Sequence, residues 1–155
     1  FIDCIHNLQE KHGKFEYAIG HSLGGMALLN ATKQQLNINK LITIGAADII
    51  NDVIHRFIAT LEQKEHIARA MKKHFDLKFE EDIDNYSASV AAKSVTIPTL
   101  VIHDENDVDV PVSCAMEIRQ NLQQGELLIT RNLGHRKILG DESVIERIVE
   151  FINRN

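Results

Sequence analysis

The stretch Gly20-His21-Ser22-Leu23-Gly24-Gly25 decides the fold of this 155-residue chain. It lies between a strand-like apolar run, residues 15–19, and a helix-like run that begins at Met26. A G-x-S-x-G turn from a strand into a helix strains the backbone at its serine and exposes the hydroxyl, while its glycines let the strand and the helix pass closely. Ser22 is therefore the first candidate for a catalytic nucleophile.

Two further motifs follow apolar runs. Residues 99–102 lead into His103-Asp104-Glu105-Asn106-Asp107-Val108-Asp109-Val110-Pro111, and residues 127–130 lead toward Asn132-Leu133-Gly134-His135. An imidazole that accepts the serine proton makes a hydroxyl a competent nucleophile, and a carboxylate on the other ring nitrogen orients that imidazole. The chain thus supplies a serine, then an aspartate, then a histidine, each after a predicted strand.

The three motifs GHSLGG, IPTLVIHDENDVDVP and NLGH resemble the α/β-hydrolase superfamily, whose catalytic triad has this chain order. The resemblance extends over roughly residues 15–152. It implies that Ser22 is the nucleophile, Asp107 the acid that orients the imidazole, and His135 the general base. The backbone N–H of Leu23, at the positive start of the following helix, is expected to be one donor of the oxyanion hole.

Neighbouring residues leave alternatives open within this site. Asp104 and Asp109 flank Asp107, so either of them is an alternative partner for the imidazole of His135. We expect His21 to be a turn residue and not a second base. His103, at the end of a predicted strand, is expected to be structural.

Alternation of strand-like and helix-like runs predicts an α/β fold, a parallel sheet with helices on both faces and part of the α/β-hydrolase fold. The strand runs are continuously apolar, as expected where helices cover both faces of a sheet. In the last helix, we expect Val144, Ile145, Ile148, Val149 and Ile152 to face the sheet. The predicted strands are 15–20, 40–45, 97–103 and 126–131, and the predicted helices are 1–12, 24–36, 50–75, 112–123 and 141–153.

Residues 51–93 form a longer connection than a simple crossover needs, within what we predict to be a single domain over 1–155. In the superfamily that the motifs resemble, an insertion at this point is a helical cap that covers the active site. Four apolar side chains with helical spacing are therefore candidates for the substrate pocket, the alternative being that they form the core of the insertion itself. They are Phe57, Leu61, Met71 and Phe75. The acidic residues 80–84 are expected to form a solvated surface.

Composition excludes several classes of protein. The net charge is −5, there is no Trp, and the sequence has no basic run, so we expect no nucleic-acid partner. No apolar run approaches the roughly 20 residues that cross a bilayer, and a cytoplasmic location is our working hypothesis. His55, His66 and His74 have helical spacing but no carboxylate or cysteine at ligand spacing, so we predict neither a metal nor a cofactor.

The resemblance also predicts what surrounds these segments. The chain begins one helix before the nucleophile strand, so we expect it to be the C-terminal portion of a longer hydrolase that lacks the first strands and the second oxyanion donor. Such a fragment should be a weak catalyst. The strand at 15–19 should have a neighbour on one side only, which predicts self-association or docking to the missing N-terminal half.

The function that we predict from the sequence is hydrolysis of a small-molecule carboxylic ester through an acyl-enzyme intermediate, with thioesters and amides left open. The alternative is a truncated, non-catalytic domain whose fold serves binding or assembly.

Overall fold

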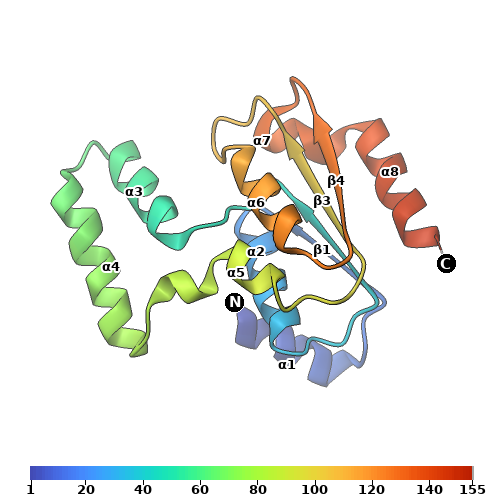
Figure 1. Cartoon of the computed structure of the whole chain (residues 1–155), viewed down its shortest axis with the longest axis horizontal. Coiled ribbons are helices and arrows are strands. Elements are labelled where there is room, and N and C mark those ends of the chain that lie inside the picture. Colours follow the sequence, from blue (N-terminus) through green and yellow to red (C-terminus); the bar gives the residue numbers. More distant parts are fainter. Residues whose placement is uncertain (155) are drawn as a thin grey trace.

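The protein is described here by a computed structural model that covers residues 1–154. Its four strands form one parallel sheet in the order β1-β2-β3-β4 (Figure 1). The predicted α/β fold with a parallel sheet is confirmed. Among these residues, no helix has the length and apolar character that a bilayer crossing requires. The strands are β1 (Tyr17–His21), β2 (Lys40–Ile44), β3 (Thr99–Asp104) and β4 (Gly125–Thr130).

Helices cover both faces of the sheet, because the strands carry apolar side chains on both sides. On one face, Leu41 and Val101 pack in a buried cluster with α2 (Leu23–Lys33), α5 (Ala88–Ala92) and α6 (Ser113–Asn121). On the other face, the alternate strand residues Ile42, Ile44, Leu100 and Ile102 pack with α8 (Glu142–Asn153). Because all four strands are parallel, their carboxyl ends lie at one edge of the sheet.

Strand β1 lies at one end of the sheet and pairs with β2 alone among the described residues, as the sequence predicts. Its Ile19 side chain is half-exposed. Helix α1 (Ile2–His12) packs next to α2, with Ile2 and Ile5 partly buried against the core and Leu8 exposed.

The predicted helical insertion is a helix pair with its own apolar cluster, lying to one side of the sheet (Figure 1). The single helical stretch expected over 50–75 is two helices, α3 (Ile50–Thr60) and α4 (Glu65–Phe79), because the chain turns between them at Glu62, whose φ is +53°. The 3-10 helix η1 (Ile83–Tyr86) closes this cluster through Ile83. Helix α5, within the same predicted segment, packs instead into the main core.

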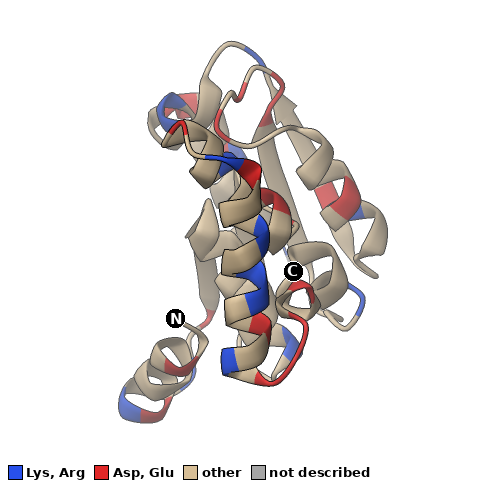
Figure 2. Cartoon of the chain, turned by 90° about the vertical axis from the view of Figure 1, so that its left-hand side faces the viewer, with Lys and Arg blue, Asp and Glu red and all other residues tan. Residues whose placement is uncertain are grey.

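The acidic residues after α4 hold the helix pair together. Lys72 forms ion pairs with Asp76 at 2.9 Å and with Asp82 at 2.8 Å. Figure 2 presents the side of the molecule on which this helix pair lies. Asp84 accepts a hydrogen bond from a backbone N–H in the first turn of α3. The backbone N–H of Ile83, followed by the Lys72 ammonium, lowers the pKa of Asp76, and Lys72 lowers the pKa of Asp82. The expectation of a merely solvated acidic surface is therefore incomplete.

Candidate active site

Ser22 occupies a strained turn between β1 and α2. Its backbone has φ 54° and ψ −124°, a conformation that non-glycine residues rarely adopt and that often marks functional sites. The Ser22 N–H donates to the carbonyl of Ile44 at 2.9 Å, which fixes the turn against the end of the neighbouring strand β2. The serine therefore lies at the carboxyl edge of the sheet, where open parallel sheets bind their ligands.

Two glycines allow the strand and the helix to pass closely at this turn. A Cβ atom added at Gly20 would lie 2.6 Å from the carbonyl oxygen of Gly24 and 2.7 Å from the nitrogen of Gly25. A Cβ added at Gly25 would lie 2.8 Å from the Cβ of Ala46. By contrast, nothing lies within 4 Å of a Cβ added at Gly24, although Gly24 completes the G-x-S-x-G motif. The close approach thus depends on Gly20 and Gly25.

Gly20→Ala should lower the free energy of unfolding by about 2–3 kcal/mol, because the new methyl group meets backbone atoms that cannot rotate away. Gly24→Ala is the matched control in the same motif. It should leave stability unchanged or raise it by up to about 1 kcal/mol, since alanine is the better helix former. Urea unfolding of the two variants measures both effects, and equal losses would contradict the assignment of the close contact to Gly20.

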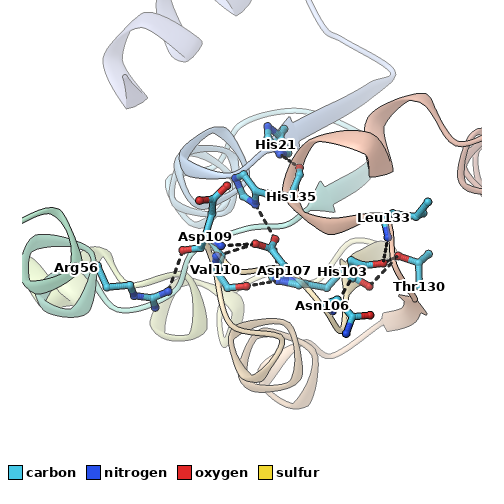
Figure 3. Close-up of polar contacts among 11 residues, drawn as sticks. His21, Arg56, His103, Asn106, Asp107, Asp109, Val110, Thr130, Leu133 and His135 are labelled. Carbon is cyan, nitrogen blue, oxygen red and sulfur yellow. Dashed lines mark hydrogen bonds and ion pairs between the residues drawn. The ribbon is translucent and has the colours of Figure 1, made fainter. Parts of the chain in front are cut away.

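His135 and Asp107 meet at the carboxyl edge of the sheet (Figure 3). His135 lies on α7 (Gly134–Lys137), and its Nδ1 is 2.7 Å from Oδ2 of Asp107. Because an ionised carboxylate only accepts hydrogen bonds, Nδ1 carries the ring proton and Nε2 is left with a free lone pair. The Asp107 side chain is 1% exposed and that of His135 is 11% exposed, so this hydrogen bond is shielded from water. The pair has the arrangement that a general base and its orienting acid require.

The loop after β3 fixes the orientation of the Asp107 carboxylate. Its Oδ1 accepts the backbone N–H groups of Asp109, at 2.9 Å, and Val110, at 2.8 Å. Oδ2 is thereby directed at the imidazole of His135 (Figure 3). One oxygen of the carboxylate holds the loop, and the other contacts the histidine.

Asp104 has a different role, because its carboxylate joins the loop after β3 to the loop after β4. Its Oδ2 accepts the hydroxyl of Thr130 at 2.7 Å and the N–H of Leu133 at 3.1 Å, while Oδ1 accepts the N–H of Asn106. Burial raises the pKa of Asp104, but these hydrogen bonds, with Thr130 the strongest, outweigh burial and bring the pKa below its usual value. Asp104 therefore positions the segment that carries His135.

Asp109 is exposed, but its carboxylate lies near Asp107 and His135. One oxygen of Asp109, one of Asp107 and one ring nitrogen of His135 all lie within 4.8 Å of one another, the one such group of potential metal ligands in residues 1–154. Asp107 and His135 are the two most buried of these groups, and they are already hydrogen-bonded to each other. His55, His66 and His74 do not form a comparable group in the described chain.

Two residues that sequence reasoning did not place in the site support the His135 ring. His21, expected to be a turn residue, ends β1 and donates from Nε2 to the carbonyl of His135 at 2.9 Å, with the two ring centroids 4.5 Å apart. Gly45 follows β2 with φ +55°, and a Cβ added there would lie 3.2 Å from Nδ1 of His135. The glycine directly after an apolar strand run is the signal that could have indicated this close approach.

A cavity of about 350 Å³ opens beside these residues. Ser22 and His135 both line it, and no hydrogen bond joins the Ser22 hydroxyl to the imidazole within the described part of the chain. Leu23 also lines it; as the first residue of α2, its N–H precedes any intrahelical acceptor. The full lining is Ser22, Leu23, Ala47, Val53, Arg56, Phe57, Thr60, Asp109, Val110, His135 and Arg136.

Of the four pocket candidates in the helix pair, Phe57 lines this cavity. Met71 and Phe75 pack against the apolar cluster between α3 and α4, and Leu61 is half-exposed just after α3. Arg56, the neighbour of Phe57, donates to the carbonyl of Asp109 at 3.0 Å and so connects α3 to the loop that carries Asp107 (Figure 3).

Comparison with known proteins identifies the fold. The model of a family of α/β hydrolases described as TAP-like proteins matches residues 80–154. Solved structures match nearly the whole chain: an α/β hydrolase enzyme from a sediment metagenome of the Mar Chica lagoon, Morocco, has a TM-score of 0.69, 18% identity, and coverage of 97% of this chain and 67% of that one. No curated protein sequence matches.

Two further solved structures also match this fold. A meta-cleavage product hydrolase from Pseudomonas fluorescens has a TM-score of 0.67 and 16% identity, with 98% of this chain and 70% of that chain covered. An α/β fold family hydrolase from Bacillus anthracis has a TM-score of 0.64 and 18% identity, with 98% and 71% covered. Identities this low establish the fold and leave the substrate open. With its parallel sheet, its strained serine turn and these structural neighbours, the chain carries part of the α/β-hydrolase fold, and its C-terminal half, residues 80–154, matches the model of one α/β-hydrolase family.

Proposed function

We propose that the chain is a serine hydrolase that cleaves a small carboxylic ester through an acyl-enzyme intermediate. Ser22 is the nucleophile, His135 the general base and Asp107 the acid that orients it. The observation that carries the proposal is the shielded hydrogen bond of 2.7 Å between His135 Nδ1 and Asp107 Oδ2, beside a cavity that Ser22 lines.

In the first half-reaction, the Ser22 hydroxyl attacks the ester carbonyl as Nε2 of His135 takes its proton. Asp107 stabilises the resulting imidazolium, and the N–H of Leu23 donates to the oxyanion of the tetrahedral intermediate. The carbon–oxygen bond to the alcohol then breaks, and His135 returns the proton to the departing oxygen. The hydrogen bond between Ser22 and His135 is expected to form as substrate binds, since catalytic contacts are often long in the empty site.

In the second half-reaction, a water molecule attacks the acyl carbon with His135 again accepting a proton. The bond from the acyl carbon to the serine oxygen breaks, and the proton passes from His135 to Ser22. The carboxylic acid leaves and the site returns to its starting state.

The size and lining of the cavity favour a compact acyl group. Its volume is about 350 Å³, and Val53, Phe57 and Val110 give it apolar walls near the serine. Small-molecule sites combine such apolar walls with a few polar groups that fix orientation. We therefore expect acetyl to butyryl esters to be better substrates than long-chain esters.

A series of aryl esters from acetate to octanoate, with the matching aryl thioester and anilide, tests this proposal. We expect Ser22-dependent release of the aryl alcohol that is fastest for the short esters and slowest for the anilide. Ser22→Ala supplies the background for each substrate. A folded protein whose rates equal that background with every substrate would reject the proposed hydrolysis and favour a role in binding or assembly.

A further inference from the structure

His103 is a fully buried histidine that the proposed reaction does not use. It lies in β3, is 0% exposed, and lies on the opposite side of Asp107 from His135 (Figure 3). Its Nε2 is 3.0 Å from the carbonyl of Val110 and 3.5 Å from Oδ2 of Asp107. The Asp107 carboxylate thus lies between two imidazoles.

The contacts of His103 fix which of its ring nitrogens carries the proton. A backbone carbonyl only accepts hydrogen bonds, so Nε2 of His103 must donate to Val110. Nδ1 is buried and has no hydrogen-bond partner in the described chain. A bare lone pair there costs less than an unsatisfied N–H donor, so the favoured tautomer carries its proton on Nε2. That N–H points at the Val110 carbonyl with the Asp107 carboxylate beside it.

Besides the direct approach of His103 to Asp107, the backbone of Val110 connects the two side chains. Its backbone N–H donates to Oδ1 of Asp107 at 2.8 Å, and its backbone carbonyl accepts from His103. The peptide groups on both sides of Val110 are therefore fixed by two buried side chains. Loss of the His103 donor would free the carbonyl and loosen the segment that holds the carboxylate.

We propose that His103 is a positioning residue for the reaction: its Nε2–H holds the Val110 carbonyl and lies against Asp107 Oδ2, so that this carboxylate keeps the orientation and the charge that His135 needs. The inference rests on the proposed function of Ser22, Asp107 and His135. It assigns His103 no contact with substrate.

Two variants of equal polarity separate this role from simple core packing. The amide nitrogen of His103→Gln lies about as far along the side chain as Nε2 of the imidazole and can replace its N–H. The amide of His103→Asn is shorter and reaches only the position of Nδ1, which has no partner. Both variants bury an amide, so a general penalty for burial affects them alike.

The readout is the pH at which the His135 imidazole titrates, followed by NMR on the free protein and by the acidic limb of kcat/KM. Loss of the donor frees the Val110 peptide that holds Asp107, so the carboxylate moves away from His135 and stabilises the imidazolium less. We expect His103→Asn to move both midpoints downward by about 0.5 pH unit and to lower kcat/KM by about 10- to 100-fold through misplacement of the carboxylate. His103→Gln should retain the wild-type midpoints and most of the activity.

Other charged groups near His135 must stay unchanged in this comparison: Asp109, within 4.8 Å, His21, whose ring packs against it, and Arg136, next in the chain. Thr130→Val is the control for general loosening of the loops, because it removes a donor from Asp104, whose carboxylate does not contact His135. It should leave the midpoint in place.

The outcomes are distinct. Equal midpoints for wild type and His103→Asn, or equal shifts for His103→Gln and His103→Asn, would overturn the positioning role. If the NMR midpoint shifts as expected while the wild-type protein hydrolyses no ester, the role of His103 toward the acid–base pair stands and the proposed function fails.

Discussion

Ser22→Ala should lower kcat/KM for a short aryl ester by about 10⁴-fold or more, because the residual activity of a triad without its nucleophile comes from binding and oxyanion stabilisation alone. The fold should persist, since the backbone N–H of residue 22 still donates to the Ile44 carbonyl. Steady-state kinetics alongside thermal unfolding check both statements.

Ser22→Gly separates the strain of the turn from the chemistry. Glycine adopts a φ of +54° without a steric penalty, so this variant should be as inactive as Ser22→Ala but more stable by about 1 kcal/mol. A glycine variant that is no more stable than wild type would show that the backbone at this position is not strained. Substantial turnover by either variant would show that another residue is the nucleophile.

Asp107→Asn should lower kcat by about 10⁴-fold with little loss of structure. Two backbone N–H groups donate to Oδ1 of Asp107, so the asparagine must place its oxygen there and its NH₂ group toward His135. The amide then donates to Nδ1, which moves the ring proton to Nε2 and removes the lone pair that accepts the serine proton.

Asp109→Asn is the matched control for this prediction, because Asp109 is exposed and only near the imidazole. It should change kcat by less than about 10-fold. Initial rates for the two variants over a range of pH test the difference. A larger loss for Asp109→Asn than for Asp107→Asn would identify Asp109 as the acid.

The sequence predicts most of the sheet because its strands are uninterrupted apolar runs and its serine turn is specific. It does not distinguish between the three aspartates after β3. Asp104, Asp107 and Asp109 occur within six positions, and what separates them is the hydrogen-bond partners that folding supplies: Thr130 and Leu133 for Asp104, and His135 for Asp107.

Helical periodicity also does not show whether an apolar helix face packs against a neighbouring helix or lines a cavity. Met71 and Phe75 have the spacing of pocket residues, but they pack within the helix pair, and Phe57 alone of the four candidates lines the cavity. In α8, the expected face included Ile145 and Val149, yet both are half-exposed. The same prediction is confirmed for Val144, which is buried, and for Ile148 and Ile152, which pack against the cluster beside the sheet, whereas the buried Phe151 was not expected on that face.

The contacts of His103 also could not be predicted from the sequence. A histidine at the end of an apolar strand is commonly a buried core residue whose ring is hydrogen-bonded. Its sequence context does not indicate that His103 contacts the carbonyl of Val110 and the carboxylate of Asp107. Both contacts arise because the loop after β3 folds back over the strand end.

Covalent labelling by an aryl fluorophosphonate, read by intact mass and peptide mapping, tests most directly that Ser22 is a nucleophile activated by His135 and Asp107. We expect one adduct per chain on the peptide that contains Ser22, no adduct in Ser22→Ala, and strongly slowed labelling in His135→Ala. Labelling at another residue, or an equal rate of labelling in wild type and His135→Ala, would contradict it.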